Sequence, residues 1–289
     1  MNTRDIRFLL KIYECESITL AAEQLYITPQ GLSNILGKIE SEVGAELFVR
    51  NRGGTYPTEY GKAFRPHAVK MLDHYEDGLK EIRRIRDEQE GTVRIGYAFG
   101  ALNRLATDFP MEFQERHQQY KLDYMELPDA VVESFVERGD LDIGFTACPD
   151  FGKFDAELME EAHILFVTHD QSRFYGRESV EVAEICDEPL TLRNDNFATT
   201  RIIMREFEKN GKTPSVLLRT GGIIRSLIFC TEHRANTLIL DFLTEDFKYD
   251  NLRAVPFKED LKWPLYMITR KGRPLGRAAL TFIDEISRN

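Results

Sequence analysis

The chain has 289 residues, which predicts two or more domains, and its 42% share of hydrophobic residues is ample for buried cores. Its 48 acidic and 38 basic side chains give a formal net charge of −10, which excludes a protein that binds nucleic acid through bulk positive charge. No run approaches the roughly 18 apolar residues of a membrane span, and no basic segment precedes a long apolar run. We therefore expect no signal peptide and a cytoplasmic protein.

The N-terminal segment predicts two short helices joined by a tight turn. Thr19 is a favourable N-cap for the first, and Ala21 and Ala22 are small enough for close helix packing. Thr28 is a second N-cap, and Pro29 takes the first helical position, where its missing N–H costs nothing. The second helix carries one apolar stripe at helical spacing, formed by Leu32, Ile35, Leu36, Ile39 and Val43.

The opposite face of this helix carries polar side chains, namely Gln30, Ser33, Asn34, Lys38 and Ser41. Such side chains hydrogen-bond base edges and phosphates, although a simple solvated face has the same composition. Residues 48–57 then read as two short strands with two glycines at the tip, the pattern of a hairpin. The segment therefore predicts an all-α winged helix-turn-helix DNA-binding domain over residues 1–58. Its expected DNA contacts are Thr28, Pro29, Gln30, Ser33, Asn34, Lys38, Arg50 and Arg52.

Residues 59–89 read as one long helix, which Thr58 can cap and in which Pro66 lies only in the early turns. Its apolar positions follow steps of three and four residues, a seam that suits helix pairing but also fits a helix packed on its own domain. The seam consists of Phe64, Ala68, Met71, Tyr75, Leu79 and Ile82.

After Gly91 strands and helices alternate, the order that is typical of an open α/β sheet. Predicted strands cover 92–97, 121–126 and 139–146, with helices through about His117 and over 130–138 between them. The pattern starts again at 164–169, with candidate strands near 190–193, 216–218 and 237–240. A late strand at 265–269 and a closing helix at 275–287 complete the prediction.

Ligands in open α/β sheets bind at the carboxyl ends of strands, beside helix N-termini. That rule selects as effector contacts Tyr97, Phe99, Gly100, Ala101, Thr146, Arg193, Asn194, Thr199 and Thr200. Other interpretations stay open: Tyr97 and Phe99 as core aromatics, Thr199 or Thr200 as a helix cap, and Arg193 or Arg201 as partners of surface carboxylates. Two arginines in a cleft would suit a carboxylate ligand.

Catalytic and metal-binding motifs are absent from the sequence. It contains no G-x-S-x-G, P-loop or H-E-x-x-H motif, and its six histidines show no compact ligand spacing. The scattered cysteines, Cys15, Cys148, Cys186 and Cys230, predict reduced and mostly buried thiols. We expect no enzyme, no metal and no cofactor.

The N-terminal segment resembles the DNA-binding domain of LysR-type transcriptional regulators. The matching residues are Phe8, Ser17, Thr19, Ala21-Ala22, Leu25, Thr28-Pro29-Gln30, Leu32-Ser33, Ile39-Glu40, Gly44, Leu47-Phe48, Arg50, Thr58 and Gly61. The resemblance continues through Arg94-Ile95-Gly96, Phe113, Gly139-Asp140-Leu141-Asp142 and Arg270-Lys271-Gly272-Arg273-Pro274. The chain departs from the family at Gly31 and Gly37 in the recognition helix. It also departs at residues 231–236, where members usually carry a glycine-rich turn.

The resemblance implies a multi-domain chain. Residues 59–89 would form a linker and dimerisation helix, and 90–289 a two-lobed, periplasmic-binding-protein-like α/β effector domain. Lobe one would hold 90–160 and 264–289, and lobe two 161–263. The implied function is a sequence-specific regulator that binds double-stranded promoter or operator DNA as a homodimer or homotetramer. A small-molecule effector between the lobes, with a carboxylate as one candidate, would modulate its DNA binding.

Two alternatives remain. The first is a regulator with a vestigial cleft that acts by DNA occupancy alone. The second is a solute-binding protein, against which the absent signal peptide and the DNA-binding head both count.

Overall fold

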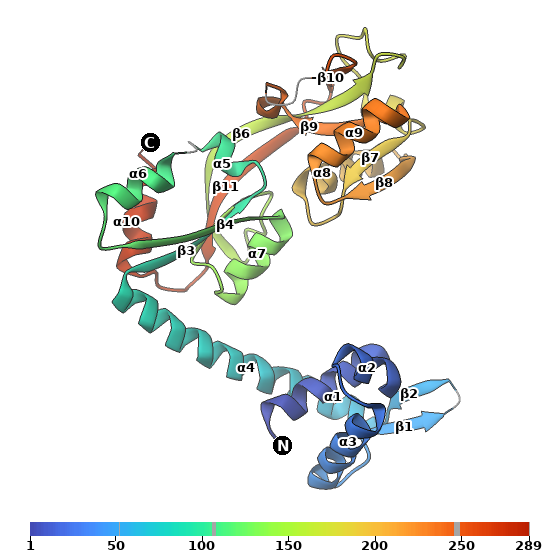
Figure 1. The fold of residues 1–289 in the computed structure, drawn as a ribbon, viewed down its shortest axis with the longest axis vertical. Coiled ribbons are helices and arrows are strands. Elements are labelled where there is room, and N and C mark those ends of the chain that lie inside the picture. Colours follow the sequence, from blue (N-terminus) through green and yellow to red (C-terminus); the bar gives the residue numbers. More distant parts are fainter. Residues whose placement is uncertain (52, 106–107, 246–248, 289) are drawn as a thin grey trace. The chain divides into compact units, whose positions relative to one another are not determined.

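The computed structural model describes residues 1–289 apart from 52, 106–107, 246–248 and 289 (Figure 1). The chain divides into two compact units, Met1–Ile85 and Arg86–Asn289. The long helix α4 (Glu59–Glu90), predicted from its seam, contributes residues to both. Over the described ranges, no helix is long and apolar enough to cross a membrane.

The N-terminal unit packs α1 (Thr3–Cys15), α2 (Ile18–Gln24) and α3 (Pro29–Val43) around one apolar core, followed by the hairpin of β1 (Phe48–Asn51) and β2 (Gly54–Pro57). Helix α3 begins as predicted, because the Thr28 side chain accepts a hydrogen bond from the Gly31 N–H at 3.1 Å. The prediction of Thr19 as the cap of α2 is wrong. The helix starts earlier, and the Ser17 side chain accepts the hydrogen bond from the Leu20 N–H.

The second unit is built on a sheet of strand order β10-β6-β11-β5-β3-β4, in which β9 also pairs with β6. Strand β3 (Thr92–Ala98) runs parallel to β4 (Lys121–Leu127) and β5 (Ile143–Ala147). The long strands β6 (Phe154–His169) and β11 (Lys262–Arg270) pair antiparallel, and the far end of β6 pairs with β9 (Thr237–Leu240) and β10 (Leu252–Pro256). A separate parallel pair joins β7 (Leu190–Arg193) to β8 (Val216–Thr220).

We define lobe one as β3–β5 with the helices α5 (Ala101–Arg104), α6 (Phe109–Arg116), α7 (Asp129–Arg138) and α10 (Arg277–Ile286). In this lobe, helices cover both faces of the sheet (Figure 1). Lobe two consists of β7–β10 with α8 (Ala198–Lys209), α9 (Ile223–His233), and the short 3₁₀ helices η1 (Val182–Ile185) and η2 (Asp241–Thr244). The strands β6 and β11 belong to both lobes. The predicted lobe boundaries at 160 and 264 therefore fall inside continuous strands.

Most predicted elements are present, with three differences. The first helix of lobe one is two helices, because a new one starts at Phe109-Pro110. Strand β10 and helix α9 had no counterpart in the prediction. Strand β6 begins ten residues before the predicted 164. The sequence did not predict its first half because that half carries exposed glutamates rather than an apolar alternation.

Candidate DNA interface and effector cleft

Helix α3 presents the polar face that the sequence predicted. Gln30, Asn34 and Lys38 are exposed and Ser33 is half-buried, while Leu32, Leu36 and Ile39 on the opposite face are buried. The Gln30 side-chain amide donates a hydrogen bond to the side-chain oxygen Oδ1 of Asn34 at 3.3 Å, so these two side chains lie together on the surface. Val43 leaves the apolar stripe, because it is exposed at the helix end.

A groove of about 740 Å³ separates the start of α3 from the hairpin. Pro29, Gln30 and Ser33 line one side, and Arg50 and Asn51 line the other. Arg50 is exposed on β1, as a wing contact requires, and the predicted contact Arg52 lies outside the described residues. The groove therefore brings four of the predicted contacts, Pro29, Gln30, Ser33 and Arg50, to one face of this unit.

The turn between α2 and α3 contains a residue that sequence reasoning missed. Tyr26 is 96% exposed and has a left-handed backbone (φ 56°). The N–H groups of Tyr26 and Ile27 donate to the carbonyls of Glu23 and Ala22, which makes this the C-terminal cap motif where glycine is usual. A fully exposed aromatic ring held in a strained backbone, just before the recognition helix, is a candidate contact.

The predicted effector residues divide into buried and accessible ones. Tyr97 is 1% exposed and stacks on Phe145 at 4.7 Å, and its hydroxyl has no hydrogen-bond partner among the described atoms. Burial raises the pKa of Tyr97 well above its usual range. Also buried are Ala101, Thr146, Thr199 and Thr200. Phe99 is exposed, and half-buried positions are Gly100, Arg193 and Asn194.

Several of these residues meet across the two lobes. Phe99 of lobe one lies 5.8 Å, ring to ring, from Phe197 at the start of α8. Gly100 (φ 92°) faces the Phe242 ring of η2, and a Cβ added at Gly100 would lie 3.6 Å from Cζ of that ring. The Asp129 carboxylate, which the sequence did not single out, accepts hydrogen bonds from both lobes and is 4% exposed.

An open cavity of about 640 Å³ lies beside this junction, lined by α7, α8, β11 and the loop after β5. Arg201 Nη2 pairs with Glu133 Oε1 at 3.0 Å, which supports the alternative that this arginine serves a carboxylate of the protein itself. Burial raises the pKa of the Glu133 carboxyl, and Arg201 opposes that effect. Burial also raises the pKa of the Cys148 thiol in the same cavity, so the thiol form is favoured there.

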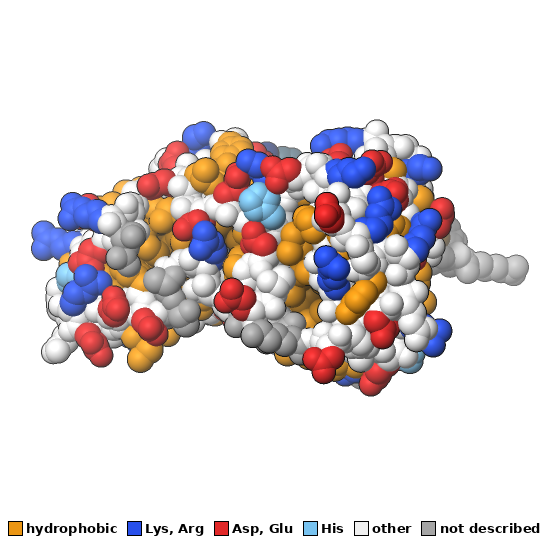
Figure 2. All heavy atoms as spheres, turned by 90° about the horizontal axis from the view of Figure 1, so that it is seen from above, with side chains coloured by type: hydrophobic (Ala, Val, Ile, Leu, Met, Phe, Trp, Pro, Cys, Tyr) orange, Lys and Arg blue, Asp and Glu red, His pale blue; other side chains and the backbone are white. Residues whose placement is uncertain are grey.

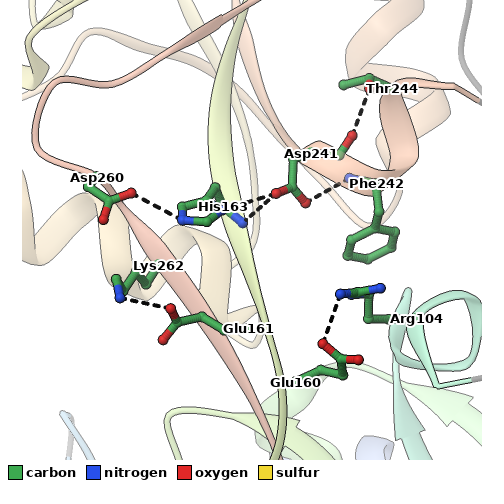
Figure 3. Close-up of polar contacts among 9 residues, drawn as sticks. All are labelled: Arg104, Glu160, Glu161, His163, Asp241, Phe242, Thr244, Asp260 and Lys262. Carbon is green, nitrogen blue, oxygen red and sulfur yellow. Dashed lines mark hydrogen bonds and ion pairs between the residues drawn. The ribbon is translucent and has the colours of Figure 1, made fainter.

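A histidine network fixes η2 against the long strands (Figure 3). His163 on β6 lies between two aspartates, with Nδ1 3.1 Å from Asp241 Oδ2 and Nε2 3.1 Å from Asp260 Oδ1. Its backbone N–H donates to the same Asp241 oxygen. Asp241 is the first residue of η2, so the network holds Phe242 where it meets lobe one.

Charge is mixed over the surface that Figure 2 presents, where acidic and basic side chains alternate without a large area of one sign. Within the part of the chain that the structure describes, no group of three His, Cys, Asp or Glu side chains is placed to hold a metal ion.

Comparisons with known proteins match both units. A family model described as "LysR substrate binding domain" matches residues 86–289, and "Bacterial regulatory helix-turn-helix protein, lysR family" matches residues 3–62. The uncharacterized HTH-type transcriptional regulator YwbI of Bacillus subtilis is 24% identical, over 98% of this chain and 95% of its own length. HTH-type transcriptional regulator BenM of Acinetobacter baylyi is 22% identical, over 93% of this chain and 90% of its own.

Solved structures show the same fold. Full-length BenM aligns with a TM-score of 0.59 at 20% identity, covering 100% of this chain and 96% of that one. Full-length CbnR, solved in complex with its target DNA, aligns with a TM-score of 0.53 at 15% identity, covering 100% and 99%. The chain belongs to the LysR family of transcriptional regulators, with a DNA-binding helix-turn-helix domain followed by a two-lobed effector-binding domain.

Proposed function

We propose that α3 reads the DNA sequence in the major groove and that the β1–β2 hairpin contacts the neighbouring phosphates. The observation that carries this proposal is the common face of Gln30, Ser33, Asn34 and Arg50 beside the groove. Short polar side chains read base edges, and an exposed arginine binds phosphate. Tyr26, fully exposed at the turn before α3, is a further candidate contact.

The exposed half of the α4 seam supports a homo-oligomer. Phe64 and Ala68 pack on the N-terminal core, whereas Met71, Tyr75, Leu79 and Ile82 are 45–67% exposed. Apolar side chains repeated at this spacing pair with a second helix of the same kind. Two copies would place two recognition helices on two half-sites, which multiplies specificity.

The two-lobed domain supports regulation by a small molecule in the cytoplasm. Phe99 and Asp129 of lobe one contact Phe197 and Ala198 of lobe two, and Gly100 faces the Phe242 ring. A ligand that alters these contacts prefers one lobe arrangement over the other, and that preference shifts the population of DNA-binding states. The structures of full-length BenM and of CbnR align with this chain over 99–100% of its length.

The test starts from a library of random-sequence DNA duplexes, because selection by the protein identifies the sequence that it binds. We would select DNA with the full chain and measure affinity by fluorescence anisotropy across a salt series. We expect one enriched sequence motif. The Ser33→Ala, Asn34→Ala double variant should bind that DNA about tenfold or more weakly, since a good base contact contributes about 1–3 kcal/mol. Ser41→Ala, farther along the same helix, is the matched control. A library that yields no motif, or equal affinity in all variants, would refute the proposal.

A further inference from the structure

The Asp129 side chain connects the two lobes through both of its oxygens. Oδ1 accepts hydrogen bonds from the Ala147 N–H at 3.1 Å and the Thr146 hydroxyl at 3.4 Å, both at the end of β5 in lobe one. Oδ2 accepts one from the Ala198 N–H at 2.9 Å, at the first residue of α8 in lobe two. A buried carboxylate is stable only when such donors satisfy it, so these bonds hold the lobes at a fixed spacing.

Helix α8 depends on this carboxylate for its N-terminal cap. Its own N-cap residue, Phe197, makes no side-chain cap hydrogen bond. The free N–H groups and the dipole at the start of a helix attract an anion. The next residue reinforces the same junction, because the Ala130 N–H donates to the Asn196 carbonyl at 2.9 Å.

The polar groups around this position bond to one another. Arg193 donates from Nη2 to the Thr199 hydroxyl at 2.9 Å, and the Thr200 hydroxyl donates to the Arg193 carbonyl at 3.0 Å. The Arg193 guanidinium lies over the Phe197 ring, 4.5 Å from its centre. Burial lowers the pKa of Arg193, and the negative charge of Asp129 opposes that effect. The negative charge of this carboxylate therefore also acts on the half-buried Arg193 guanidinium.

We propose that Asp129 is a built-in carboxylate ligand of the interlobe cleft. It fills the anion position at the start of α8, closes the lobes without an effector and excludes external carboxylates from that position. The regulatory meaning of this closure rests on the proposed function, because only a regulator converts lobe closure into altered DNA binding. Two arginines near this junction already interact with the protein's own carboxylates: Arg201 pairs with Glu133, and the charge of Asp129 acts on Arg193.

The experiment removes the internal carboxylate and supplies one from solution. Thermal unfolding of full-length Asp129→Ala is followed against sodium formate and sodium acetate, with acetamide and sodium chloride as neutral and ionic controls. We expect a lower Tm than wild type, raised saturably by formate and acetate only, because a ligand that binds the native state stabilises it. Wild type and Asp187→Ala, which removes an exposed aspartate of the same unit, should show no carboxylate-specific rise. Absence of a carboxylate-specific rise in Asp129→Ala, or an equal rise in wild type, would overturn the proposal.

Asp129→Asn keeps the test decisive if the alanine variant does not fold. An amide has one acceptor oxygen, so it cannot accept from the Ala147 and Ala198 N–H groups through separate atoms. We expect faster hydrogen exchange at residues 147 and 198 in Asp129→Asn than in wild type or Asp187→Asn. Unchanged exchange at both positions would contradict the proposal.

The outcome of the DNA-selection experiment is independent of the outcome of the carboxylate experiment. A carboxylate-specific rescue with no enriched DNA motif would support the internal ligand and refute the proposed function. An enriched motif with no rescue would refute the internal ligand alone.

Discussion

Glu40 accepts a hydrogen bond from the backbone N–H of Leu47 at 2.7 Å, through the same carboxylate oxygen that the Phe48 N–H reaches at 3.1 Å. One side chain near the end of α3 thus fixes the start of the hairpin. This contact joins the end of the helix to the start of the wing, together with the hydrogen bonds that Thr58 donates to the backbone carbonyls of Glu46 and Leu47.

Glu40→Gln should therefore destabilise the N-terminal unit and weaken DNA binding together. Hydrogen bonds to a charged acceptor contribute about 1.5–3 kcal/mol, and the amide keeps part of that as a neutral acceptor. We expect a loss of about 1–2 kcal/mol in the free energy of unfolding, measured by urea denaturation of the full chain. Glu46→Gln, an exposed glutamate beside the hairpin, is the control. Equal stability of both variants would show that the contact does not hold the hairpin.

Tyr26→Gly should move stability and DNA affinity in opposite directions. Glycine adopts the left-handed backbone of this position without the steric cost of about 1 kcal/mol that a side chain carries, although it loses more chain entropy on folding. We expect stability that is unchanged or slightly higher, with DNA affinity several-fold lower because an exposed ring is lost. Tyr26→Phe separates the hydroxyl from the ring. Anisotropy on the selected DNA that shows no change for Tyr26→Gly would exclude this residue from the interface.

Tyr97→Phe tests whether a predicted effector contact belongs to the core instead. The Tyr97 hydroxyl is buried without a described hydrogen-bond partner, and an unsatisfied buried polar group costs about 1–3 kcal/mol. Its removal should leave the free energy of unfolding unchanged or higher. A clear loss of stability would mean that the hydroxyl has a partner, and calorimetry of the two proteins decides between these outcomes.

Glu133→Gln should change how stability depends on pH. Burial raises the folded-state pKa of Glu133 above its ordinary value of 4.5, so the folded chain holds this proton to higher pH than the unfolded chain. The contribution of Glu133 to stability is therefore greatest below the unfolded pKa and falls as pH rises through the window up to the folded pKa. The free energy of unfolding of the variant minus that of wild type should increase across this window and then level off. Urea unfolding at successive pH values from 4.5 to about 7 measures it. A difference that falls with pH would have the wrong sign for a raised pKa.

Polar substitutions in the exposed α4 seam should dissociate the oligomer without unfolding the chain. Leu79→Glu with Ile82→Glu places charges at side chains that are 46% and 67% exposed in the single chain, so folding loses little. Sedimentation equilibrium should show a smaller assembly, and binding to paired half-sites should weaken. Asp73→Asn, at an exposed position outside the seam, serves as the control. An unchanged mass would place the interface elsewhere.

The N-terminal domain could be predicted closely because its signals are local. The Thr28 cap, Pro29 at the first helical position, the helical stripe of α3 and the paired glycines of the hairpin each act within a few residues, and the structure confirms these elements. The one misplaced cap, at Thr19, shows the limit of that reasoning. Ser17 and Thr19 both carry a suitable hydroxyl, and the structure has the buried Ile18 as the first helical residue, directly after Ser17.

By itself, the sequence determined the family, the order of domains, the polar face of α3 and most strands of the α/β domain, since periodicity and capping depend on near neighbours. Only the tertiary structure showed that Tyr97 is buried, that β6 and β11 serve both lobes, and that Asp129 meets Ala198 across 69 residues of chain. The physical reason is that the sequence can show where a strand ends and a ligand can bind. Which groups of the protein lie at that position depends on the distant segments that folding brings together. Asp129 is an ordinary acidic residue in the sequence, and it bonds to both lobes only because folding brings the start of α7 next to the start of α8.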